Sequence, residues 1–115
     1  MRWVAIVQGV YFFLTGIWPI VHIRSFMWVT GPKHDLWLVR TVGVLVIVIG
    51  GVLVLAGIRN TLAAELITLA IGSSVALTAI DTIYSVRGTI SKIYLADAVA
   101  EIALVIVWSV LLLSR

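Results

Sequence analysis

The chain has 115 residues, of which 63% are hydrophobic and 11% are charged, and its formal net charge is +3. This composition, with a mean hydropathy of +1.22, excludes an ordinary soluble globular domain and indicates an integral membrane protein. The sequence has no cysteine, which excludes thiolate metal sites, disulfide exchange and lipidation at cysteine. Its basic residues are scattered rather than clustered, so the positive charge does not indicate nucleic-acid binding.

Four stretches are long and apolar enough to cross a bilayer, because a spanning helix needs about 20 mostly apolar residues. They cover residues 3–23, 37–58, 63–86 and 93–114. We therefore expect an all-α fold, a single transmembrane domain over residues 1–115 built as an up-down-up-down four-helix bundle. The first stretch follows a basic residue, as in a signal peptide, but has no A-x-A-like cleavage site, so we expect it to be retained as a helix.

The first expected helix carries polar side chains at intervals of seven residues: Gln8, Thr15 and His22. This spacing points inward in a left-handed helical bundle. Pro19 removes one backbone hydrogen bond, and we expect it to kink the helix near its end.

The connection at 24–36 is longer than connections between packed helices usually are. Three apolar residues make it amphipathic enough to lie among lipid headgroups: Phe26, Met27 and Trp28. A Gly31-Pro32 turn follows, and Asp35 is placed to cap the second helix.

The second expected helix has glycines at intervals of seven residues: Gly43, Gly50 and Gly57. Small residues along one face let helices approach closely in lipid. We expect this stripe to pack against another helix, and we expect homo-oligomers that associate through it.

The third and fourth expected helices each carry polar residues on one face. On the third these are Ser74, Thr78, Asp81 and Ser85, and on the fourth Tyr94, Asp97 and Glu101, with Trp108 two turns further along. A charged side chain at mid-helix costs roughly 2.5–3.5 kcal/mol on insertion scales. We therefore expect both faces to look into the protein.

The polar residues gather in one half of the expected bundle, because the first connection and the third lie on the same side of the membrane. The sequence thus predicts a one-sided pocket closed by an apolar plug, formed by His22, Arg40, Asp81, Tyr94, Asp97 and Glu101, with Lys33, Asp35 and Tyr84 at its rim. Asp97 and Glu101 are like charges four residues apart, so one must be protonated or a cation must neutralise them. That cation is Arg40, a substrate, or a metal held by Asp81, Asp97 and Glu101.

Charge asymmetry predicts the orientation. With four spans, Arg2, Arg59 and Arg115 share one side, and the other side has Arg24, Lys33, Arg40, Arg87 and Lys92. The excess favours a cytoplasmic position for the first and third loops, with both termini outside, in a bacterial inner (plasma) membrane. We expect tryptophans to anchor both interfaces, Trp3 and Trp108 on the terminal side and Trp28 and Trp37 on the other.

The stretches TGPKHDLWLVRTVG and YLADAVAE resemble segments of small uncharacterised four-helix bacterial membrane proteins. This resemblance implies no activity. The overall size is also similar to that of DoxX-type proteins, with which the chain shares no motif. Neither resemblance adds a site residue.

These features favour binding or movement of a small cation, a proton or a polar solute at the acidic pocket. One alternative is a membrane-embedded enzyme acting on an amphipathic lipid or isoprenoid, although the chain has no H-E-x-x-H or G-x-S-x-G motif. Another is a non-catalytic membrane assembly subunit. No haem, flavin or nucleotide motif is present, and the sequence leaves the cofactor, if there is one, unknown.

Overall fold

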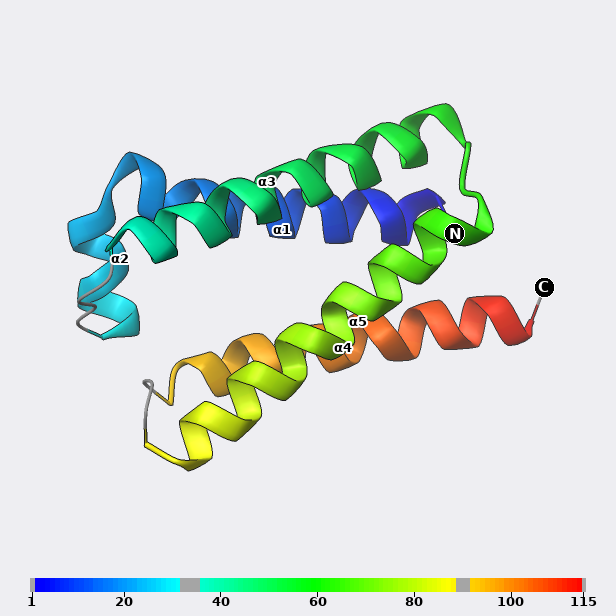
Figure 1. The fold of residues 1–115 in the computed structure, drawn as a ribbon. Coiled ribbons are helices and arrows are strands. Elements are labelled where there is room, and N and C mark those ends of the chain that lie inside the picture. The colour runs from blue at the N-terminus through cyan, green and yellow to red at the C-terminus, as the bar shows by residue number, and fades with distance from the viewer. Residues whose placement is uncertain (1, 32–35, 89–91, 115) are drawn as a thin grey trace.

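The computed structural model describes residues 2–31, 36–88 and 92–114, and this part of the chain is helical without a strand. Its helices are α1 (Arg2–Val21), α2 (Ile23–Thr30), α3 (Leu36–Arg59), α4 (Ala64–Val86) and α5 (Tyr94–Leu113). All except α2 are long and apolar enough to cross a membrane. The prediction of an all-α fold with four helices long and apolar enough to span a membrane is confirmed for the described residues, and the helix bounds are close to those expected. Both ends of the chain lie at the same end of the molecule (Figure 1).

The long connection predicted to lie among lipid headgroups contains the short helix α2. His22 caps it, because the His22 Nδ1 atom accepts a hydrogen bond from the Ser25 backbone N–H at 3.1 Å. The Ser25 hydroxyl in turn accepts a hydrogen bond from Trp18 Nε1 at 2.9 Å. Phe26 turns back against Trp18, with the two rings edge to face at 5.4 Å. These contacts hold α2 against the end of α1.

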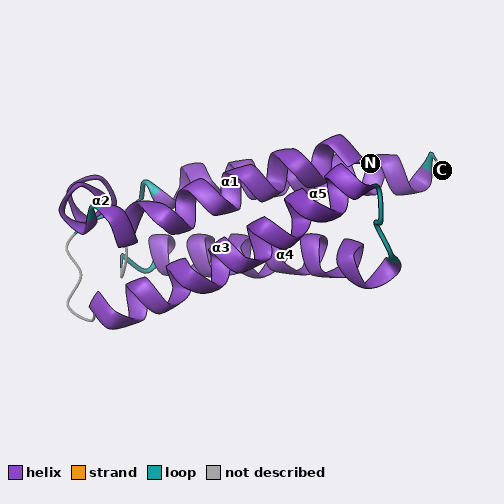
Figure 2. Ribbon diagram, turned by 90° about the horizontal axis from the view of Figure 1, so that it is seen from above, coloured by secondary structure: helices purple, strands orange, loops and turns teal. Residues whose placement is uncertain are grey.

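The glycine stripe of α3 packs against α1 of the same chain, and the two helices lie side by side in both ribbon views (Figures 1 and 2). A Cβ atom on Gly9 would lie 2.6 Å from the Gly50 carbonyl oxygen, and one on Gly16 would lie 2.5 Å from the Gly43 carbonyl oxygen. A Cβ atom on Gly57 would lie 2.8 Å from the Arg2 carbonyl oxygen. The expected close packing is therefore present, because only glycine leaves room for the opposing backbone.

Self-association through the same stripe stays a prediction. Since α1 covers Gly43, Gly50 and Gly57, a second copy would reach them only by supplying its own α1 in exchange.

The end of the molecule that holds both termini has a closely packed apolar core. Its buried residues come from all four long helices: Val4, Ala5, Leu53, Ile67, Ala70 and Trp108. The side chain of Gln8 extends from α1 toward α4 and α5 in this region. Its Nε2 atom donates to the Ala70 carbonyl at 2.9 Å and to the Ser74 hydroxyl at 3.0 Å, and its Oε1 atom accepts from Trp108 Nε1 at 2.7 Å. Gln8 thus ties α1 to both α4 and α5.

The four tryptophans predicted to anchor the interfaces divide into two groups. Trp3, Trp28 and Trp37 are largely exposed, as expected for side chains at a membrane interface. The prediction that Trp108 is an interfacial anchor is wrong, because this side chain is fully buried and hydrogen-bonded to Gln8. Its face of α5 is the one turned toward α1.

Candidate ligand cavity

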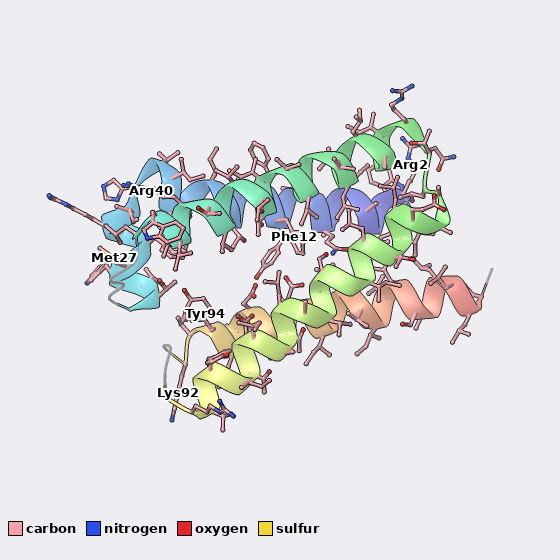
Figure 3. All side chains as sticks on the ribbon, viewed as in Figure 1. Arg2, Phe12, Met27, Arg40, Lys92 and Tyr94 are labelled. Carbon is pink, nitrogen blue, oxygen red and sulfur yellow. The ribbon has the colours of Figure 1, made fainter. Side chains whose placement is uncertain are left out.

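A cavity of about 550 Å³ lies at the end of the molecule opposite the termini. The C-terminal halves of α1 and α4, the N-terminal halves of α3 and α5, and α2 all contribute to its wall. Phe12 and Tyr94 point into the space between the α1–α3 pair and the α4–α5 pair (Figure 3). The volume is within the range of about 300–1,000 Å³ typical of small-molecule sites.

Most of the cavity wall is apolar and much of it is aromatic. The aromatic side chains are Tyr11, Phe12, Trp18, Phe26 and Tyr94. Aliphatic side chains add to the apolar surface, among them valines of α3 and Leu77 of α4. Such walls favour a ligand with an apolar body, because its burial removes hydrocarbon surface from water.

Glu101 lies at the cavity wall, and its side chain is 0% exposed. Neither carboxyl oxygen has a hydrogen-bond partner in the described part of the chain, although the Ser74 hydroxyl lies close by. Buried polar groups in proteins almost always have partners, and an unpaired buried charge is costly. The buried carboxyl group of Glu101, without a hydrogen-bond partner among the described residues, is therefore the most unusual feature of the cavity wall.

Asp81 and Asp97 form a pair of carboxyl groups on the same wall as Glu101. Asp81 is 4% exposed, its Oδ2 atom has no hydrogen-bond partner among the described residues, and its carboxyl group lies within reach of that of Asp97. Asp97 is half-buried and accepts a hydrogen bond from the Tyr11 hydroxyl. The expectation that these faces of α4 and α5 turn inward is confirmed by the burial of Ser74, Asp81 and Glu101.

The described wall contains no basic side chain. Arg40 in particular is exposed and lies outside the cavity. The sequence predicted that Arg40 would reach the carboxyl groups, and it does not. Successive residues of an α-helix are separated by a rotation of about 100° around the helix axis. By this measure Arg40 lies about 60° to one side of Gly43, whereas the cavity-lining Val42 and Val46 lie about 60–100° to the other side. Once the glycines face α1, Arg40 points outward.

The remaining predicted pocket residues have varied positions. Tyr94 lines the cavity. His22 is exposed and serves as the cap of α2, and Tyr84 is exposed on α4 and absent from the wall. Lys33 and Asp35, predicted for the rim, lie outside the described residues.

The three carboxyl groups do not make a metal site in this arrangement. Within residues 2–31, 36–88 and 92–114, no three His, Asp or Glu side chains are grouped closely enough to hold a metal ion. The acids are neighbours along one wall and do not converge on a point.

The aromatic wall was not anticipated from the sequence. Tyr11, Phe12 and Trp18 lie in an almost uniformly apolar helix, where nothing local separates a lipid-facing ring from one that lines a cavity. Thr15, seven residues after Gln8, was a usable signal, since it shares the cavity with Tyr11.

Comparison with protein-family models, with curated proteins and with solved structures found no match to the chain.

Proposed function

We propose that the protein binds a small cationic solute within the membrane, in the cavity lined by Asp81, Asp97 and Glu101, and moves it between the two sides. The observation that carries this proposal is Glu101: a fully buried carboxyl group, unpartnered among the described residues, at the wall of a cavity with ligand dimensions. A bound cation, or a proton exchanged for it, supplies the missing partner.

The electrostatics of the wall support a cation over an anion. Three carboxyl groups line the cavity, and no described basic residue does. An anionic ligand would add negative charge to a region of low dielectric constant, where like charges repel strongly.

The proposal includes the arrangement in the membrane. The four long helices cross a bacterial inner membrane as an up-down-up-down bundle, with the cavity end toward the cytoplasm and both termini outside. The exposed basic residues at the cavity end support this orientation: Arg24, Arg40, Arg87 and Lys92, against Arg2 and Arg59 at the other end.

Carbodiimide labelling tests the binding function. Dicyclohexylcarbodiimide is an apolar reagent that adds to protonated carboxyl groups in apolar surroundings, and peptide mass spectrometry locates the adduct. In lipid nanodiscs we expect labelling of Glu101, slowed by sodium, tetramethylammonium or tetraethylammonium chloride over a concentration series. Labelling that is absent from Glu101, or unchanged by every cation, would contradict the proposal.

Glu65 provides the matched control. It is an exposed acid in the first turn of α4, away from the cavity. Glu65→Gln should leave the labelling and its protection unchanged, whereas Glu101→Gln should remove the cation-protected adduct.

The absence of cysteine permits a direct test of orientation. Single cysteines at Thr61 and Ser114 report on the terminal side, and one at Val86 reports on the cavity side, all at exposed positions. A membrane-impermeant maleimide added to intact cells should label the first two and spare the third. The reverse pattern would invert the proposed orientation.

A further inference from the structure

The wall of the cavity carries information about the kind of cation. A small inorganic ion needs several oxygen ligands converging at short distance, and the described His, Asp and Glu side chains offer no such group. A cavity of about 550 Å³ is also far larger than one ion requires. These two observations disfavour a dehydrated metal ion as the occupant.

The aromatic residues favour an organic cation. The faces of Tyr, Phe and Trp rings attract cations, most strongly when water is excluded, and quaternary ammonium groups are commonly bound in this way. Here Tyr11 and Tyr94 line the cavity together with Asp97 and Glu101. Phe12, Val42 and Leu77 supply apolar wall beside them.

We infer that the solute is an amphipathic organic cation, such as a quaternary ammonium or phosphonium carrying aromatic or branched apolar groups. Its charged centre lies at the part of the wall formed by Glu101 of α5 and Asp81 of α4. Both carboxyl oxygens of Glu101 and the Oδ2 atom of Asp81 are buried there without a hydrogen-bond partner among the described residues. Its apolar body fills the space against α1 and α3. This inference rests on the proposed function and specifies the chemical class of the solute.

Two probes of equal shape and opposite charge test the inference. Tetraphenylphosphonium and tetraphenylborate carry the same four phenyl groups, so simple partitioning into an apolar cavity does not separate them. Each is added alone to the protein in nanodiscs, and protection of Glu101 from dicyclohexylcarbodiimide is measured. Tetraphenylphosphonium should protect at a concentration at least about tenfold lower than tetramethylammonium, and tetraphenylborate should not protect.

Variants separate the charged centre from the apolar body. In equilibrium dialysis corrected with empty nanodiscs, Glu101→Gln should weaken tetraphenylphosphonium binding by at least about tenfold, the scale for removing one partner of a buried charge pair. Asp81→Asn provides a second carboxyl variant, and Glu65→Gln should bind as the parent protein does. Leu77→Trp fills part of the cavity and should weaken binding of the bulky phosphonium by a larger factor than it weakens protection by the much smaller tetramethylammonium. Val46→Phe repeats that test if Leu77→Trp does not fold.

The failures are distinguishable. Equal protection by tetraphenylphosphonium and tetramethylammonium would overturn the inference and leave the proposed function standing, as would protection by tetraphenylborate together with the small cations. Binding that survives both Glu101→Gln and Asp81→Asn would also overturn the inference. An absence of protection by any cation would overturn both proposals.

Discussion

Gln8 and Glu101 are both completely buried in apolar helices, yet their surroundings are opposite. Gln8 lies in the packed end of the molecule and makes three side-chain hydrogen bonds, to Ala70, Ser74 and Trp108. Glu101 lies at the hollow end and has no hydrogen-bond partner among the described residues. A buried polar group with partners holds helices together, and one without partners costs stability. The packed end therefore holds the helices together, and the hollow end is where we propose that the solute binds.

The largest effect is expected at the close contact between α1 and α3, because both helices extend through the packed end and the hollow end. Gly9→Ala places a Cβ atom 2.6 Å from the Gly50 carbonyl oxygen, so α1 and α3 must separate. We expect a loss of about 3 kcal/mol in the free energy of unfolding, at the upper end of typical overpacking costs. The measurement is SDS-induced unfolding in mixed micelles, followed by circular dichroism.

Gly51→Ala and Gly72→Ala are the controls for this prediction. Neither glycine has an atom within 4 Å of the added Cβ, and alanine is a better helix former than glycine. Both variants should unfold at or above the parent's SDS fraction. Equal losses at Gly9 and Gly51 would show that the close packing of α1 and α3 is not what stabilises the fold.

A smaller loss is expected at the packed end itself. Gln8→Leu leaves the Trp108 indole N–H buried without its partner, with a cost of about 2 kcal/mol. The same SDS titration measures the loss, and tryptophan fluorescence should report a changed environment for Trp108. Thr68→Val, at an exposed site on α4, is the control. A neutral Gln8→Leu variant would mean that this network does not join α1 to α4 and α5.

At the hollow end we expect a substitution to raise the free energy of unfolding rather than lower it. Glu101→Met replaces a buried carboxyl group, unpaired within the described chain, by an apolar side chain of similar length, and such replacements are often stabilising. We expect a gain of about 1 kcal/mol in the same titration, together with the loss of cation-protected carbodiimide labelling. A destabilised Glu101→Met variant would place Glu101 with Gln8 as a structural residue.

The smallest effect is expected at His22. Because its Nδ1 atom caps α2, His22→Ala should destabilise this helix by about 0.5–1 kcal/mol, as lost caps do. Hydrogen exchange at the amides of α2 measures the change. Cation protection of Glu101 should be unaffected, since His22 lies outside the cavity wall. Loss of the cation protection of Glu101 in His22→Ala would show that His22 contributes to the binding site.

The sequence was sufficient for the helices and for the inward faces of α4 and α5, because runs of apolar residues and isolated acids have strong physical consequences in lipid. It was insufficient for the position of Arg40. In α3, which is apolar all round, the glycines show which face meets α1, but the cavity lies on one flank of that face. Which flank it is depends on the side from which α4 and α5 approach, and this is a property of the assembled chain. The same reason hid the aromatic wall supplied by α1.

The glycine contacts between α1 and α3 also bear on how the cavity changes size. Gly9 meets Gly50 and Gly16 meets Gly43, so both contacts hold a single antiparallel alignment, and a shift of one helix by one turn would put side chains where only glycine fits. The two helices are therefore held in one register. A change in the size of the cavity would have to come from a movement of α4 and α5 relative to this pair, and the hydrogen bonds of Gln8 to Ala70, Ser74 and Trp108 would limit that movement at the packed end.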